Sequence, residues 1–203
     1  MLQLIAHELR TPVAKIDAAR QVLELLEKTP EAEPEARQSR LAVIRQATER
    51  LKLLFTLTLD RERREGQGVA PPPLPVDLLL QDLEALCGPV LRERLRIDIA
   101  APEVQVRADA REVVFALLNL LEGMAAATPQ DSALTLSVME ERSERGAPQV
   151  VFIFTVPLSQ DGERFSGTAF VRSVFEACGG GLRWLSADEG MQRIQLWVPE
   201  ASH

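Results

Sequence analysis

Three side chains near the start of the sequence could together perform phosphoryl chemistry: His7, Glu8 and Thr11. An imidazole near neutral pH is a competent nucleophile toward phosphorus, and a neighbouring carboxylate can orient the proton on its other ring nitrogen. On a helix, Thr11 lies one turn after His7, where its hydroxyl could position an attacking water. The protein has two histidines, and the other one, His203, is the last residue. Imidazole chemistry in the folded body therefore rests on His7.

The residues around His7 have the pattern of an amphipathic helix. Apolar side chains recur mostly every three or four positions: Leu2, Ile5, Leu9, Val13, Ile16, Leu23 and Leu26. If this face points inward, His7 and Glu8 lie on the outer, solvated side. Pro12 removes one backbone hydrogen bond within the helix and is expected to bend it, which exposes the turn before it.

A second helix is expected after a short loop. Two prolines and several acidic residues interrupt the pattern at residues 29–34, and apolar residues become periodic again over residues 41–57. Two helices joined by a short loop cannot bury both apolar stripes on each other alone. The economical solution is a homodimer in which two hairpins form a four-helix bundle.

The string HELRTP at residues 7–12 resembles the phosphoacceptor box of sensor histidine kinases. In that family the box also stands early in the first helix of a two-helix dimerisation domain. The resemblance implies that His7 is phosphorylated, that Glu8 is the base assisting it, and that Thr11 serves in dephosphorylating a response regulator. The alternative is an ordinary surface histidine on a solvated helix face, and the six-residue match in its predicted context favours the phosphoacceptor. The supporting residues of the box are Arg10 and Pro12.

The rest of the chain is predicted to form a second domain. The proline-rich string GQGVAPPPLP marks a linker at residues 66–75, which divides the chain into a hairpin at 1–65 and an α+β domain at 76–203. We expect helices at 76–91, 110–127 and 165–177, and strands at 95–99, 104–107, 134–138, 150–156, 182–185 and 193–198. This order predicts one mixed sheet with helices on a single face.

Three local features sharpen that expectation. The strand at 150–156 is apolar on both faces, so it should lie at the centre of the sheet. Asp109 is a suitable N-cap for the helix that follows it. The three glycines at 179–181 are interpreted as a helix stop, and Trp184 and Trp197 as packing residues on paired strands.

The order of these elements resembles the ATP-binding domain that follows the hairpin in histidine kinases, and residues 117–125 resemble its N box. The family holds a magnesium nucleotide with an asparagine on the N-box helix, an aspartate in a D-x-G-x-G turn and a glycine-rich lid. Here Gly123 stands at the metal-binding asparagine position, and Asn119, one turn earlier, matches a more peripheral position. No D-x-G-x-G follows the central strand, and of the glycine-rich string only Gly167 and Thr168 remain.

The loss of these motifs together predicts that the domain does not bind ATP productively. We therefore expect a phosphotransfer protein, similar to the kinase-derived histidine phosphotransferases of bacterial phosphorelays. His7 would pass a phosphoryl group between aspartates of receiver domains, with no cofactor or metal of its own, because the receiver supplies the magnesium. Two alternatives stay open: the catalytic core of a divergent ATP-dependent sensor kinase, and a non-catalytic protein that binds a response regulator.

The composition predicts a cytoplasmic protein. The 203 residues are 46% hydrophobic and 26% charged, no stretch is apolar enough for a membrane span, and the two cysteines suit a reducing compartment. A net charge of −7 argues against nucleic-acid binding. The sequence begins six residues before His7, which fits a free-standing relay protein as well as a piece of a longer sensor.

Overall fold

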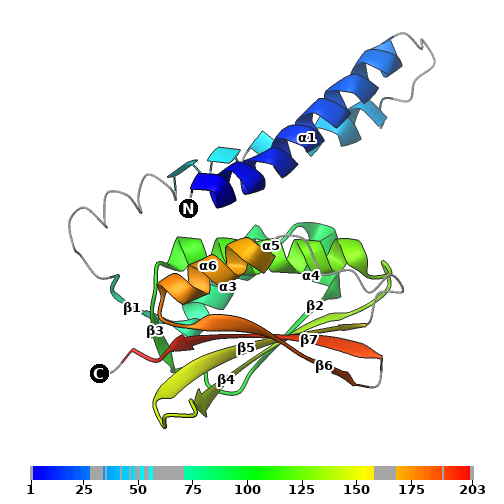
Figure 1. The fold of residues 1–203 in the computed structure, drawn as a ribbon. Helices are drawn as coiled ribbons and strands as arrows, with labels where there is room; N and C mark the ends of the chain where they lie inside the picture. The colour runs from blue at the N-terminus through cyan, green and yellow to red at the C-terminus, as the bar shows by residue number, and fades with distance from the viewer. Residues whose placement is uncertain are drawn as a thin grey trace. The chain divides into compact units, whose positions relative to one another are not determined.

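A computed structural model gives the fold of the chain (Figure 1). The structure describes residues 2–27, 34, 36–41, 43–45, 47–48, 51–52, 55–56, 71–157, 168–188 and 190–201, with the side chains of 2–8, 11, 27 and 186–188 left aside. The chain divides into two compact units, Met1–Val69 and Ala70–His203, and each is described by itself.

The first unit is built on α1 (Leu2–Glu27), whose bounds confirm the predicted first helix. The described residues between 34 and 56 are helical too, and the Arg37 guanidinium donates a hydrogen bond to the Leu26 carbonyl oxygen at 3.3 Å. Ala19 and Ala47 are the buried small residues of the two segments. Pro34, predicted as part of the loop, is helical, because proline is tolerated in the first turn of a helix.

The second unit contains a five-stranded sheet in the order β2-β4-β5-β7-β6 and a two-stranded sheet of β1 and β3. The strands are β1 (Pro73–Pro75), β2 (Leu95–Ile99), β3 (Gln105–Arg107), β4 (Leu134–Arg142), β5 (Pro148–Pro157), β6 (Gly181–Asp188) and β7 (Met191–Pro199). The helices are α3 (Val76–Leu86), α4 (Pro89–Arg94), α5 (Ala110–Ala127) and α6 (Thr168–Ala177).

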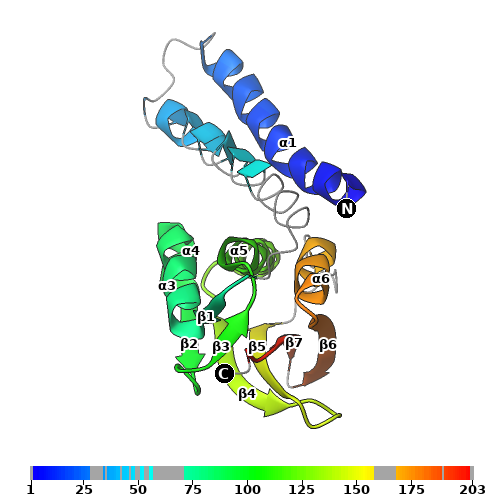
Figure 2. The ribbon, with the colours of Figure 1, turned by 90° about the vertical axis from the view of Figure 1, so that its left-hand side faces the viewer.

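The larger sheet is mixed, as predicted. β2 pairs in parallel with β4, and all the other pairs in this sheet are antiparallel. The helices of this unit cover one face of the sheet, with α5 between α3 and α6 (Figure 2). β5 is the central strand, and its alternate residues Phe152 and Phe154 are fully buried in the core beneath the helices.

Two differences from the prediction change the order of the elements, and several strands are also longer than predicted, β4 and β6 the most. Residues 73–75, predicted as part of the linker, form β1 and pair with β3 in the register Leu74↔Val106. The helix predicted at 76–91 is two helices, because Pro89 has no N–H to donate and disfavours helical geometry at the preceding Gly88. The Arg92 guanidinium then donates to the Glu84 carbonyl oxygen at 2.7 Å, near the end of α3.

Asp109 caps α5 as predicted. Its Oδ1 accepts a hydrogen bond from the Glu112 backbone N–H at 3.0 Å, so one of the unpaired donors at the start of the helix is satisfied. This cap fixes the first turn of α5, the helix that carries Asn119 and Gly123.

Arg94 forms hydrogen bonds both to the C-terminal end of α5 and to the loop before β4. Its guanidinium donates four hydrogen bonds of 2.7–3.1 Å, to the carbonyl oxygens of Ala125, Pro129 and Ser132 and to Thr128 Oγ1. These acceptors lie 31 to 38 residues away in the sequence. A single side chain therefore joins α4, α5 and the approach to β4.

We expect Arg94→Ala to lower the free energy of unfolding by about 2–3 kcal/mol, because several carbonyl groups lose their donor at once and bonds to a charged donor are stronger than neutral ones. Urea unfolding followed by tryptophan fluorescence measures the change. Arg96→Ala is the matched control, because within the described part of the chain the Arg96 guanidinium bonds to the local carbonyls of Glu93 and Leu95. Equal effects of the two substitutions would contradict this role of Arg94.

Candidate functional site

α1 places the residues of the HELRTP string on consecutive turns of one helix. His7, Glu8 and Thr11 all lie within α1, and the side chains of these three residues are outside the described ones. The helical spacing puts Thr11 one turn after His7 on the same side of the helix. Arg10 is exposed and Pro12 is buried, so the helix turns the proline toward its packed side.

Pro12 lies inside α1, which continues to Glu27 without interruption. Because proline has no N–H, it cannot donate to the carbonyl oxygen of Glu8, four residues before it. The carbonyl beside His7 therefore lacks its intrahelical partner. The bend that the sequence predicts at this turn stays a prediction, and the missing N–H of Pro12 is its physical basis.

The second candidate position is on α5. Asn119 is 3% exposed, and neither its side-chain oxygen nor its side-chain nitrogen has a hydrogen-bond partner among the described residues. Gly123 follows one turn later and is half-buried, and it offers no side-chain ligand. The sequence placed both residues on one helix. That the amide is buried without a partner could not be read from the sequence.

The first turn of α6 lies against the same side of α5. The rings of Phe115 and Phe170 meet edge to face with their centroids 5.5 Å apart. Asn119 is one turn beyond Phe115, and Thr168, the first residue of α6, is half-buried. Gly167, the other residue retained from the glycine-rich string, lies outside the described residues.

The two helices run antiparallel, so Asn119 lies toward the N-terminal end of α6. β3 leads into α5, and its Val106 forms a bridge with Glu200 just after β7. α6 leads into β6, whose first residue Gly181 pairs with Trp197 near the same end of β7. The start of α5 and the end of α6 therefore lie at the same end of β7, and Figure 1 shows this course.

A magnesium nucleotide, which the resemblance to histidine kinases implies, fits this region only in part. An unpaired amide and the first turn of a helix are suitable groups for phosphate oxygens. Magnesium needs several oxygen ligands, and Gly123 supplies none. Among the described residues, no three or more His, Cys, Asp or Glu side chains gather to hold a metal ion. The residues present therefore fit the phosphates and do not fit the metal.

The thiol of Cys87 is not a nucleophile at neutral pH. It is 4% exposed at the end of α3, and burial raises the pKa of the Cys87 thiol to about 11. The thiol is therefore protonated near pH 7, and the thiolate form that reacts is scarce.

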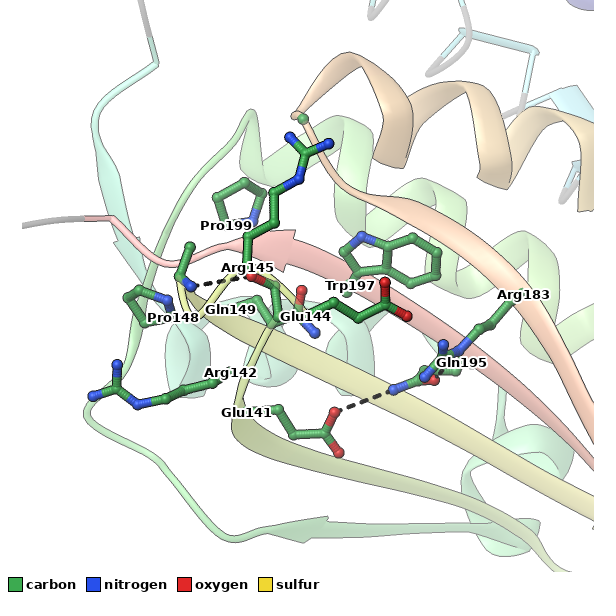
Figure 3. Close-up of a pocket in the computed structure, with 13 residues that line it drawn as sticks. Glu141, Arg142, Glu144, Arg145, Pro148, Gln149, Arg183, Gln195, Trp197 and Pro199 are labelled. Carbon is green, nitrogen blue, oxygen red and sulfur yellow. Dashed lines mark hydrogen bonds between the residues drawn. The ribbon is translucent and has the colours of Figure 1, made fainter.

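A hollow of about 570 Å³ lies on the face of the sheet that the helices leave open (Figure 3). Gln195, 3% exposed, accepts a hydrogen bond from Arg183 and donates one to Glu141 at 3.4 Å. The Arg183 guanidinium lies 5.8 Å from the centre of the Trp197 ring. These side chains satisfy one another, which agrees with the interpretation of Trp197 as a packing residue. The sequence did not predict the burial of Gln195, because a polar residue on an open sheet face is usually solvated.

Comparison with known proteins gives the hairpin a family match. Residues 1–67 match the model of the His Kinase A (phospho-acceptor) domain, and this range includes the whole HELRTP string. The match lies within the first unit and does not extend into the second. No curated protein is significantly similar in sequence.

Solved histidine kinases share the fold. The Acinetobacter baumannii histidine kinase AdeS is 16% identical, with a TM-score of 0.59 over 95% of this chain and 97% of that chain. The cytoplasmic segment of histidine kinase QseC is 14% identical, with a TM-score of 0.51 over 73% of this chain and 95% of that one. The histidine kinase domain of the E. coli osmosensor EnvZ is 13% identical, with a TM-score of 0.50 over 64% and 89%.

Together these similarities confirm the coarse prediction from the sequence. A domain of the His Kinase A type occupies residues 1–67, and a sheet domain follows whose fold resembles that of histidine kinases. None of the helices that the structure describes is long and apolar enough to cross a membrane.

Proposed function

We propose that this protein is a transmitter of two-component signalling in which His7 accepts a phosphoryl group and delivers it to an aspartate of a receiver domain. The observation that carries the proposal is the HELRTP string inside the phospho-acceptor match at residues 1–67. A ring nitrogen of His7 attacks phosphorus, so that an N–P bond forms while the bond from phosphorus to the leaving oxygen breaks.

The neighbours of His7 have assigned roles in this proposal. Glu8 takes or orients the proton on the second ring nitrogen, which raises the nucleophilicity of the first. Thr11, one turn along α1, positions water for the loss of phosphate from the response regulator. Arg10 is exposed beside the site, and Pro12 weakens the turn of α1 that carries it.

An exposed apolar surface on the first unit supports a homodimer through the helical hairpin. Val13, Leu25, Leu41 and Phe55 are 46–62% exposed in the single chain. Burying them against a second hairpin in a four-helix bundle would remove this apolar surface from water. In this arrangement the exposed side of α1 remains available to receiver domains in the cytoplasm.

The phosphoryl group on His7 has two candidate donors. The similar folds of solved histidine kinases support ATP as the donor, and they favour this candidate over transfer without ATP. Gly123 supports the second candidate, in which a phosphorylated receiver is the donor and supplies the magnesium, because the chain lacks the metal ligand there. A third candidate, a protein that only sequesters a response regulator, needs the hairpin and no phosphorylation.

Labelling from two donors separates these candidates. The protein is incubated with radiolabelled ATP and magnesium, and separately with a receiver domain carrying radiolabelled phosphate on its aspartate. Label from ATP identifies a kinase, and label from the receiver alone identifies a phosphotransferase. The absence of label from both donors, together with tight receiver binding, would contradict the role of His7 and favour sequestration.

A further inference from the structure

We infer that the outer surface of α3 and α4 is a docking site for a partner protein, and that the partner binds there through an amphipathic helix whose apolar stripe is flanked by Lys and Arg. We name this surface the α3–α4 corner. It comprises the exposed side chains of Leu78, Asp82, Leu86, Val90 and Glu93, and the hollow where the two helices meet. The inference concerns the second unit alone and does not depend on the phosphoryl chemistry of the first.

Exposed apolar side chains gather at the α3–α4 corner. Among the described residues of the second unit, the most exposed large apolar side chains are Leu78, Leu86 and Val90, at 47%, 52% and 69%. All three belong to these two consecutive helices. Single exposed apolar residues are ordinary on a protein surface, whereas a group of them marks an interaction site.

The position of α3 in the fold leaves this side open. The inward side of α3 carries Val76, Leu79, Leu80 and Leu83, which are buried in the core. α5 lies between α3 and α6, so α3 and α4 form one edge of the helical layer of this unit (Figure 2). The outer side of the pair is therefore not packed against another described helix of the same unit.

A hollow of about 470 Å³ completes the corner. It is lined by Cys87, Pro89, Arg92 and Glu93, at the point where Pro89 starts a new helix after α3. The lining residues lie in the sequence among the exposed Leu86 and Val90. A hollow beside apolar side chains suits a helix that lays its apolar face on the surface and inserts one side chain.

The charge around these apolar groups is acidic. Asp82, Glu84 and Glu93 are exposed, and none of them has an ion pair with another described residue. The Arg92 guanidinium donates to three carbonyl oxygens at the end of α3, at 2.7–3.4 Å, and Arg94 is bonded to the end of α5. The basic groups of α4 are thus engaged with the backbone, while the carboxylates face the solvent.

The end of α3 adds to this negative character. The last turn of α3 contains no basic residue, and the C-terminal end of a helix carries a partial negative charge. A second copy of this protein docked by the same surface would bring acidic groups against acidic groups. A partner with basic residues beside its apolar stripe satisfies both features of the corner, and a helix supplies the required spacing of three and four residues.

Binding of two synthetic peptides to the whole chain tests the site. The first is a helix of about 18 residues with leucines along one side and lysines elsewhere, and the second has glutamate in place of every lysine. Calorimetry measures the affinity. We expect the lysine peptide to bind the wild-type chain and the glutamate peptide to bind at least about tenfold more weakly, because opposite charges attract and like charges repel.

Two substitutions and two matched controls locate the bound peptide. Val90→Ser and Glu93→Lys should each weaken binding of the lysine peptide about tenfold, and Glu93→Lys should strengthen binding of the glutamate peptide. Leu25→Ser changes an apolar residue of α1 that is 62% exposed, and Glu140→Lys makes the same charge change at an exposed position of β4. Neither control should alter binding.

Four results would overturn the inference. They are the absence of binding of the lysine peptide to the wild-type chain, equal binding of the two peptides, a loss of binding in Leu25→Ser as large as in Val90→Ser, and an assembly that sediments as a smaller species in Val90→Ser. The last result would make a second copy the occupant. The first two are measured on the wild-type chain, so they hold even if a variant does not fold. Labelling of His7 is a separate measurement, so failure of this site and failure of the proposed function can be told apart.

Discussion

His7→Ala is expected to abolish phosphoryl incorporation from either donor, because alanine has no nucleophilic nitrogen and His7 is the histidine of the phospho-acceptor match. We expect the loss of label to be complete, because without the His7 ring nitrogen the bond to phosphorus cannot form. The measurement is radiolabel retained on the protein after denaturing electrophoresis. Label on the wild type should be lost in acid and retained in alkali, which is typical of a phosphorus–nitrogen bond.

The chain supplies its own matched control for this prediction. The protein has two histidines, so His203→Ala removes the other imidazole and should leave the labelling unchanged. Circular dichroism should show that both variants keep the helical content of the wild type. Label that persists in His7→Ala, or that disappears in His203→Ala, would place the phosphorylation elsewhere.

Glycine at position 180 is required by a close approach between two parts of the backbone. A Cβ built on Gly180 would lie 1.7 Å from the carbonyl oxygen of Trp197. The preceding Gly179 has φ of +78° and lies in the turn that follows α6. Its N–H donates to the Glu176 carbonyl oxygen, and the Gly180 N–H donates to the Phe175 carbonyl oxygen. These bonds fix the chain at this point, so it cannot move away from β7 without loosening the end of α6.

Gly180→Ala should therefore lower the free energy of unfolding of the second unit by at least about 4 kcal/mol. Losses this large are exceptional for a single substitution, and here the cause would be a clash between the added Cβ and the backbone. The measurement is urea unfolding followed by tryptophan fluorescence. The two tryptophans, Trp184 and Trp197, lie on β6 and β7, so the signal reports on this unit alone.

Two other glycines provide controls of graded severity. A Cβ at Gly88 meets nothing within 4 Å, and its φ of −62° suits any residue, so Gly88→Ala should be close to neutral. Gly146 has equally open surroundings but a φ of +79°, so Gly146→Ala should cost about 1 kcal/mol through backbone strain alone. A Gly180→Ala protein as stable as these controls would show that β6 and β7 tolerate a wider spacing.

The sequence by itself determined the features that depend on neighbouring residues. The spacing of apolar side chains predicted α1, the capping preference of aspartate predicted the start of α5, and the apolar character of both faces placed β5 at the centre of the sheet. The HELRTP string alone was enough to single out His7 as the candidate phosphoacceptor. Periodicity, caps and short motifs act over a few residues, so they can be read directly from the order of amino acids.

Only the tertiary structure decided the features that depend on distant residues. The pairing of residues 73–75 with β3 turned part of an expected linker into a strand. Gly180 was interpreted as part of a helix stop, and its approach to Trp197, seventeen positions later, gave it a second and stricter role. The burial of Asn119 without a partner is likewise a property of the packed unit, and its neighbours in the sequence do not specify it. Such contacts join segments that are far apart in the chain, and no local pattern records which segments meet.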